Sequence, residues 1–256
     1  MKIIKESVFL ILIFLSFTLA SCSKEDVSLT PELLIYCGET MALPMQEIAN
    51  IIEEQENCKI TFLLDGSKNL LDIIDVNKVG DLFLPGSPSY LDAADEKGYV
   101  TSIILVGQNI PALIVPKGNP KEISKSLEVL IDPQLKIVVG SSESGSIGLE
   151  TKKILESKNI YNKVLGNVLY LTTDSKDITK AVVSGEADVG INWKATAFWP
   201  ENRDFISALE FEDISISPEG IKLGLLEFSK FPEYARLFIN FTISSKGQEI
   251  FKKYGF

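Results

Sequence analysis

The sequence predicts an α/β protein with two doubly wound lobes that are joined by extended crossovers. Short apolar runs alternate with segments of helical spacing between residues 33 and 98. An extended segment bounded by prolines, 110–116, interrupts this rhythm, and the alternation restarts near residue 136. Alternating strands and helices are typical of parallel sheets with right-handed crossovers. The interruption followed by a second series therefore predicts a second lobe.

The first series begins with residues 33–37 (LLIYC), a continuous apolar run that ends at Gly38. Such a run is expected for a parallel strand that is buried on both faces. Residues 41–56 carry apolar side chains at helical spacing and predict the first helix. The following strands and helices alternate in the same way and are expected at 59–64, 70–74, 81–84 and 89–97.

The second series repeats this pattern after the extended segment. Its strands and helices are expected at 136–139, 148–155, 168–171, 178–184 and 188–193. The composition shifts after Ala197, and a further strand is expected at 221–226, with closing helices at 234–243 and 246–254. We therefore assign 32–108 and 198–256 to lobe 1, and 109–197 to lobe 2.

The N-terminal residues predict an exported lipoprotein. Residues 8–19 form a short apolar run after two lysines, as in a secretory signal, and are too few to span a bilayer. Residues 19–22 (LASC) resemble the bacterial lipobox, in which the cysteine is acylated. We expect a signal peptide at 1–21, lipid on Cys22 and a polar tether at 22–31. An ordinary signal with a chance cysteine is the alternative.

The charge and composition exclude several classes of function. The formal net charge is −10, which disfavours nucleic acid and anionic membrane surfaces as partners. The chain has no histidine, so the commonest general base and the commonest metal ligand are missing. We expect no cofactor, no metal site and no enzymatic activity.

Two cysteines remain after Cys22, and we expect them not to form a disulfide. Cys37 lies at the carboxyl end of the first expected strand, whereas Cys58 lies just before the second. If these strands are parallel, the two thiols lie at opposite edges of the sheet. A disulfide needs Cα atoms within about 7 Å.

Ligands of open α/β sheets bind beyond the carboxyl ends of the strands, where this chain has small polar residues. Four such stretches precede expected helices, two in each lobe: 38–40, 65–68, 144–148 and 172–175. A helix N-terminus offers free N–H groups and a positive dipole end, so four of them predict an anion site. Helix capping by the hydroxyl side chains is the alternative for each stretch taken singly.

Residues 33–100 and 136–197 resemble the periplasmic molybdate-binding proteins of ABC importers. The resemblance is carried by three stretches: 36–49 (YCGETMALPMQEIA), 79–91 (VGDLFLPGSPSYL) and 185–193 (GEADVGINW). It implies a periplasmic binding protein-like fold of type II, a bound molybdate or tungstate, and no catalysis. It also implies a monomer that works with the permease and ATPase subunits of an importer.

The resemblance also implies which residues bind the anion. Thr40 and Ser67 fall on hydroxyl donors of the family, and Ile147 and Ser175 fall on or near backbone N–H donors. Trp193 falls where many members have a tyrosine; its indole is either a donor to the anion or a core aromatic. Adjacent residues complete the candidate site: Glu39, Gly66 and Ser146.

Two carboxylates depart from the family pattern. Glu39 adjoins Thr40 and Asp174 adjoins Ser175, and a carboxylate facing a dianion would repel it. We expect Glu39 to point away from the cleft; neutralisation by Lys68, coordination of the metal centre of the oxyanion or a different ligand are the alternatives. The same fold could instead bind sulfate, phosphate, ferric ion or an organic anion. Glu39 and Asp65 as a glycosidase-like carboxylate pair represent the enzyme alternative.

Overall fold

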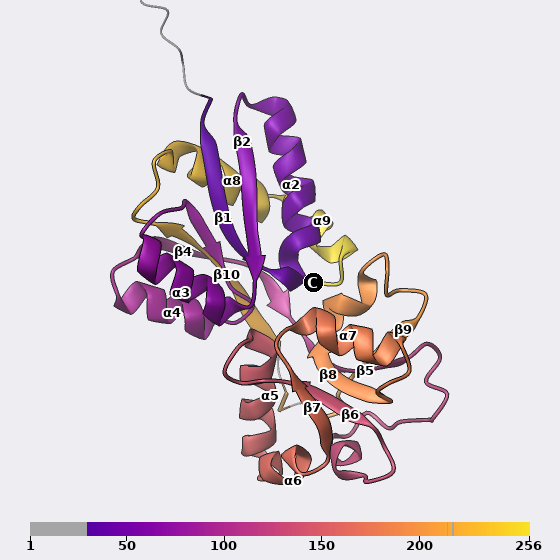
Figure 1. The fold of residues 1–256 in the computed structure, drawn as a ribbon. Coiled ribbons are helices and arrows are strands. Elements are labelled where there is room, and N and C mark those ends of the chain that lie inside the picture. The colour runs from indigo at the N-terminus through magenta and orange to yellow at the C-terminus, as the bar shows by residue number, and fades with distance from the viewer. Residues whose placement is uncertain (1–29, 214, 217) are drawn as a thin grey trace, which may run out of the picture. The chain divides into compact units, whose positions relative to one another are not determined.

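The computed structural model describes residues 30–213, 215–216 and 218–256. Two five-stranded sheets, each packed against helices, form the two lobes, so the predicted α/β fold class is confirmed (Figure 1). Residues 31–256 cluster as one unit that contains both sheets. The predicted signal peptide and Cys22 lie outside the described residues. Within the described residues, every helix is too short or too polar to cross a bilayer.

The first sheet has the strand order β2-β1-β3-β10-β4. Strand β1 pairs in parallel with β2 and β3, whereas β10 is antiparallel to β3 and β4. The strands of this sheet are β1 (Glu32–Gly38), β2 (Lys59–Asp65), β3 (Leu82–Leu84), β4 (Val100–Asn109) and β10 (Glu219–Leu226).

Helices cover both faces of the first sheet, which explains the continuous apolar run of β1. Leu33, Ile35 and Cys37 pack in a core with α2 (Ala42–Gln55), α8 (Pro232–Ile243) and α9 (Ser245–Lys253). Tyr36 points to the opposite face and packs with residues of α3 (Ser67–Asn77) and α4 (Pro88–Glu96). Because neighbouring residues of a strand face opposite sides, a strand buried on both faces needs apolar residues at every position.

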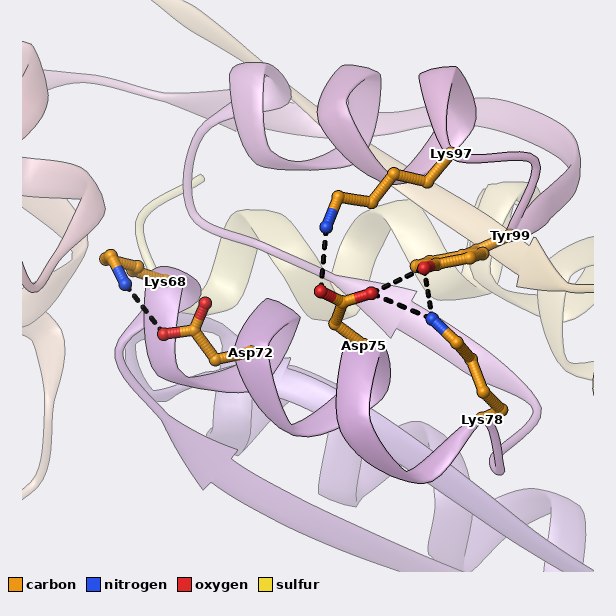
Figure 2. A network of polar contacts seen from close by, with 6 residues as sticks. All are labelled: Lys68, Asp72, Asp75, Lys78, Lys97 and Tyr99. Carbon is orange, nitrogen blue, oxygen red and sulfur yellow. Dashed lines mark hydrogen bonds and ion pairs between the residues drawn. The ribbon is translucent and has the colours of Figure 1, made fainter.

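A polar network fixes the C-terminal end of α3 to its neighbours. Asp75 forms ion pairs with Lys78 and Lys97, both at 2.8 Å, and accepts a hydrogen bond from Tyr99 (Figure 2). Lys97 ends α4, and Tyr99 precedes β4. The hydrogen bonds from Lys78, Lys97 and Tyr99 hold the pKa of Asp75 below its usual range. The network therefore supports α3, the helix whose first residue is Ser67.

The second sheet has the order β7-β6-β8-β5-β9 and repeats the layout of the first. Strand β6 pairs in parallel with β7 and β8, whereas β5 is antiparallel to β8 and β9. Its strands are β5 (Pro111–Pro116), β6 (Ile137–Gly140), β7 (Val168–Thr172), β8 (Val189–Trp193) and β9 (Ile206–Glu210). Its helices are α5 (Ser146–Ser157), α6 (Tyr161–Leu165) and α7 (Ser175–Val183). Within the described residues there are also three 3₁₀ turns: η1 (Glu39–Met41), η2 (Leu127–Ile131) and η3 (Lys194–Phe198).

The chain crosses between the sheets twice, and the second crossing differs from the prediction. The first crossing joins β4 directly to β5 through Ile110. The return lies between β9 and β10, so the prediction that lobe 1 resumes at residue 198 is wrong. Strand β9 pairs with β5, with Ala112 opposite Glu210. The polar composition after Ala197 marks the turn between η3 and β9, where Asn202 is buried and hydrogen-bonded to Thr196.

Cys37 and Cys58 are both buried and free, as the sequence predicts. Cys37 lies opposite Leu64 at the carboxyl end of β1 and β2. Cys58 directly precedes Lys59, which lies opposite Glu32 at the amino end of the same pair. The parallel register therefore separates the thiols along the length of the strands.

Candidate functional site

The carboxyl ends of two parallel strands meet in each lobe. Gly38 of β1 lies opposite Asp65 of β2, and Gly140 of β6 lies opposite Thr172 of β7. The loops that follow these strands enclose a cavity of about 20 Å³. Six residues of lobe 1 and five of lobe 2 line it: Gly38, Glu39, Thr40, Asp65, Gly66, Ser67, Gly145, Ser146, Ile147, Asp174 and Ser175.

The hydroxyl residues of the cavity do not cap their helices. Gly66 is the N-cap of α3 and Gly145 is the N-cap of α5, and neither end has a side-chain cap. Ser67 and Ser146 are instead the first residues of these helices. The first N–H groups of a helix have no acceptor within the helix. Capping is therefore wrong as an explanation of these two serines, and their helix ends keep free donors at the cavity.

Ser67 and Ser146 line the cavity, and the hydroxyl oxygen of each accepts one hydrogen bond from its own surroundings. The hydroxyl of Ser67 accepts a hydrogen bond from the backbone N–H of Gly86 at 2.9 Å. The hydroxyl of Ser146 accepts one from Nε1 of Trp193 at 3.3 Å. A hydroxyl that already accepts still has its own proton to donate. Each lobe thus contributes one oriented O–H donor.

Trp193 is a partner of Ser146 and does not line the cavity. Its side chain is fully buried at the end of β8, within the core of lobe 2. The prediction of a direct indole donor is therefore not met in this structure, because the indole N–H is used by Ser146. The core-aromatic alternative is therefore the one that the structure supports, and Trp193 also donates a hydrogen bond to a residue of the cavity.

The other predicted donors lie at the cavity. Thr40 is 4% exposed, and its hydroxyl has no hydrogen-bond partner among the residues that the structure describes. Ile147 has a buried side chain in the core of lobe 2, which leaves its backbone for the cavity. Ser175 begins α7, and its carbonyl accepts a hydrogen bond from Nδ2 of Asn192 at 2.8 Å.

Two of the three carboxylates at the cavity are occupied by local donors. Asp65 accepts hydrogen bonds from the N–H of Gly66 at 2.6 Å and from Nδ2 of Asn69 at 3.0 Å. Asp174 caps α7 by accepting the N–H groups of Lys176 and Asp177 at 2.8 and 3.0 Å. These bonds stabilise both negative charges through backbone and side-chain dipoles.

Glu39 is the exception, because it lines both the cavity and an adjacent surface hollow, so the expectation that it points away from the cleft stays a prediction. It lines the cavity, and its Oε2 atom is buried without a hydrogen-bond partner among the described residues. Burial, followed by the charge of Asp174, raises the pKa of Glu39, and Lys176 opposes the shift. Lys68 pairs instead with Asp72 at 2.7 Å on the exposed side of α3 (Figure 2).

The two lobes touch directly beside the cavity. A Cβ atom on Gly66 would lie 2.8 Å from the carbonyl oxygen of Ser144, across the boundary between the lobes. A Cβ atom on Gly86 would lie 2.3 Å from the hydroxyl of Ser146 and 3.7 Å from that of Ser67. The structure is therefore a closed arrangement. The sequence analysis does not identify Gly86 as a residue at the contact between the lobes. Its position in the turn 85–88 (PGSP) is the one sequence feature that could have indicated it.

Asn109 is a further polar residue that the sequence analysis misses. It ends β4 at the first crossing and is 1% exposed. Its Nδ2 donates to the carbonyl of Gly86 at 3.0 Å, and its Oδ1 has no partner among the described residues. Asn109 therefore fixes the Gly86 turn against the crossing strand.

Comparisons with known proteins place the chain in a family. The family model described as bacterial extracellular solute-binding protein matches residues 33–256. A Haemophilus influenzae protein whose name describes it only as a binding protein is 24% identical over 88% of this chain and 90% of its own length.

Solved structures share the fold. One, described as the substrate-binding domain of a molybdenum ABC transporter from Clostridium difficile, has a TM-score of 0.67 and 25% identity, over 88% of this chain and 98% of that one. A periplasmic thiamin-binding protein has a TM-score of 0.75 and 18% identity, over 88% and 81% of the two chains. The match of the family model over residues 33–256, together with two lobes that close over a polar cavity, shows that this chain belongs to the bacterial extracellular solute-binding proteins.

Proposed function

We propose that this protein is the substrate-binding component of an ABC importer and that it captures a small tetrahedral oxyanion, molybdate or tungstate, between its lobes. The observation that carries this proposal is the cavity itself. About 20 Å³ of space is lined by helix N-termini, hydroxyl residues and three carboxylate residues from the two lobes. A single water molecule needs about 10–15 Å³ on this measure, so the closed site suits a small compact ion.

The donors at the cavity suit an anion that must be bound and released. Neutral N–H and O–H groups recognise negative charge without leaving an unpaired cation when the cleft opens. A hydrogen bond to a charged group contributes about 1.5–3 kcal/mol. Five or six of them, less the cost of ordering and closure, reach the roughly 8–11 kcal/mol of a micromolar to tens-of-nanomolar site. The likeness to a molybdenum transporter's substrate-binding domain supports this choice of ligand.

Other ligands of the same fold are the alternative. Sulfate, phosphate or a small organic anion would use the same donors, and the unpartnered Glu39 favours a ligand that carries a proton. A bare ferric ion is disfavoured. No three His, Cys, Asp or Glu side chains group as a metal ion requires in residues 30–213, 215–216 and 218–256. Thiamin is the ligand of one structural neighbour, but it is much larger than a cavity of about 20 Å³.

Ligand screening by thermal unfolding tests the proposal. Residues 22–256 with Cys22 replaced by Ala would be melted with molybdate, tungstate, sulfate, phosphate, ferric ion and thiamin. A ligand at 100 times its Kd adds about 2.7 kcal/mol of stability, or about 5–10 °C for a chain of this size. We expect an oxyanion to give the largest shift. A shift with thiamin alone would reject the proposal.

We further propose that the mature protein is a monomer held at the extracytoplasmic face of the membrane by lipid on Cys22. There it would meet the permease and ATPase subunits of its importer. The position of Cys22 directly after the apolar run supports this, and more than one acyl chain is needed for a stable anchor. Mass spectrometry of the native protein should find a lipid-modified Cys22 as the first residue. An unmodified N-terminus at another position would reject the anchor.

A further inference from the structure

Glu39 differs from the other carboxylates of the cavity because it has no donor. Asp65 accepts two hydrogen bonds at 2.6 and 3.0 Å, and Asp174 accepts two at 2.8 and 3.0 Å. The Oε2 atom of Glu39 is buried and accepts none from any residue that the structure describes. A buried carboxylate oxygen without a partner is costly, so its partner is expected to arrive with the ligand.

The charges around Glu39 are mostly negative. Asp65 faces it from the end of β2, and Asp174 and Asp177 face it from the first turn of α7. Lys176, also on α7, is the cation that opposes them, and it shares an adjacent surface hollow with Glu39 and Glu201. Burial and these carboxylates together raise the pKa of Glu39. The site therefore makes a negative charge on this side chain less favourable than it is in water.

A fully deprotonated dianion and an ionised Glu39 cannot share a cavity of about 20 Å³ without strong repulsion. A single proton between them changes the repulsion into a hydrogen bond, as in a pair of carboxyl groups that shares one proton. The proton has two sources. An anion of the hydrogen phosphate type brings its own, and Glu39 accepts. With molybdate, tungstate or sulfate, Glu39 takes up a proton from water and donates to an anion oxygen.

We propose that the complex holds one proton between Glu39 and the bound oxyanion, so that Glu39 couples binding of deprotonated dianions to proton uptake and favours anions that carry a proton. This inference rests on the proposed oxyanion function of the same cavity and adds a residue that sets specificity. Glu39 acts on the ligand directly, through its carboxyl group at the start of η1.

Titration calorimetry at pH 6, 7, 8 and 9 tests the proposal with sulfate, molybdate, tungstate and phosphate. Each pH is measured in two buffers of different ionisation enthalpy, so that the heat reports the number of protons taken up. For the wild type at pH 8, we expect uptake of about one proton per sulfate, molybdate or tungstate. Affinity for these dianions should fall up to tenfold per pH unit. Phosphate in its hydrogen phosphate form should bind without uptake and with little dependence on pH between 8 and 9.

The variant Glu39→Gln carries an amide that donates without titrating. It should bind the dianions at least tenfold more tightly than the wild type at pH 8, without proton uptake. Glu201→Gln is the matched control, because Glu201 lies on the adjacent surface but not at the cavity, and it should behave as the wild type.

Two results would contradict the proposal in different ways. If sulfate, molybdate or tungstate binds the wild type without proton uptake and with the same affinity from pH 6 to pH 9, the role of Glu39 is rejected and the oxyanion function stands. If none of the four oxyanions binds the wild type at any of these pH values, the oxyanion function is itself rejected, and the role of Glu39 with it. The proton count is measured on the wild type, so the first result does not depend on the folding of a variant.

Discussion

The indole Nε1 of Trp193 lies 3.3 Å from the hydroxyl oxygen of Ser146, to which it donates a hydrogen bond. Trp193 ends β8 and Ser146 begins α5, so the bond joins a buried strand to the first turn of a helix at the cavity. The hydroxyl oxygen of Ser146 therefore accepts one hydrogen bond from the indole, and its own proton remains available to donate to another acceptor. A core residue thereby orients a residue of the candidate site.

Replacing Trp193 by Phe should weaken oxyanion binding only modestly. The variant keeps a large aromatic ring but loses the N–H group, so we expect a loss of about 1 kcal/mol, roughly fivefold in Kd. If the indole N–H donated directly to the anion, its loss would cost about 1.5–3 kcal/mol of binding free energy. A double-mutant cycle with Ser146→Ala, followed by calorimetry, separates the two roles. Additive losses of affinity would show that Trp193 contacts the anion itself.

Thr40 and Ser67 should respond differently to loss of their hydroxyls. Thr40→Val should cost about 1.5–3 kcal/mol of affinity with stability nearly unchanged, because its hydroxyl has no partner among the described residues. Ser67→Ala should lower affinity similarly and also lower stability by about 1–3 kcal/mol, because it leaves the buried N–H of Gly86 unpaired.

Thr61→Val is the matched control for both variants. Its hydroxyl bonds to the carbonyl of Leu33 at 3.1 Å within the first sheet, so stability should fall while affinity is kept. Denaturant melts and calorimetry on the same samples check each variant. Unchanged affinity in both Thr40→Val and Ser67→Ala would exclude these hydroxyls from the binding site.

Gly66→Ala should block closure of the lobes without harming the fold. The backbone of Gly66 has φ −61° and ψ 142°, which alanine adopts readily. Its new Cβ would meet the carbonyl oxygen of Ser144 at 2.8 Å in the closed arrangement. We expect at least a tenfold loss of affinity and little change, about 0.5 kcal/mol, in the free energy of unfolding of the ligand-free protein.

Gly166→Ala is the control, because a Cβ there would come no closer than 3.4 Å to its neighbours, which lie in α6. Small-angle scattering should show compaction on ligand addition for the wild type and for Gly166→Ala but not for Gly66→Ala. Equal compaction in all three would mean that Gly66 does not limit closure.

Because Glu219 lies beside Glu150, we expect the free energy of unfolding to fall as pH rises towards neutrality. Glu219 begins β10, and its Oε1 lies 3.7 Å from Nζ of Lys153, which also pairs with Glu150 on α5. Burial and the neighbouring Glu150 raise the pKa of Glu219 to about 7. Between its unfolded pKa of about 4.3 and about 7, the folded state holds the extra proton. The stabilisation is therefore complete below about pH 4, declines as pH rises through this window, and is gone above about pH 7.

The variant Glu219→Gln isolates this effect from Glu39, whose raised pKa acts in the same direction. Urea melts from pH 5 to pH 8 should show a decline in the free energy of unfolding for the wild type and a flatter profile for the variant. If the two proteins show parallel pH profiles, Glu219 is not the group that holds the extra proton in the folded state.

The sequence predicts the strands and most of the cavity because both depend on local patterns. Buried parallel strands need unbroken apolar runs, and their carboxyl ends bring together the loops that carry Thr40, Ser67, Ser146 and Ser175. Strand β4 and the pairing of β9 with β5 were not predicted, because β4 is half-exposed and strand pairing is a long-range property. The partner of Trp193 and the charged surroundings of Glu39 depend on contacts between elements far apart in the chain. No local pattern encodes them.

Calorimetric titration of a variant with one change in each lobe, Thr40→Ala with Ser146→Ala, tests whether both lobes bind the anion. The oxyanion that best stabilises the wild type would be titrated into both proteins under the same conditions. If the two lobes bind the anion together, losing one donor from each should cost at least about 3 kcal/mol, more than a hundredfold in Kd. An unchanged Kd in the double variant would show that the anion binds outside this cavity, and the proposed binding site would be rejected.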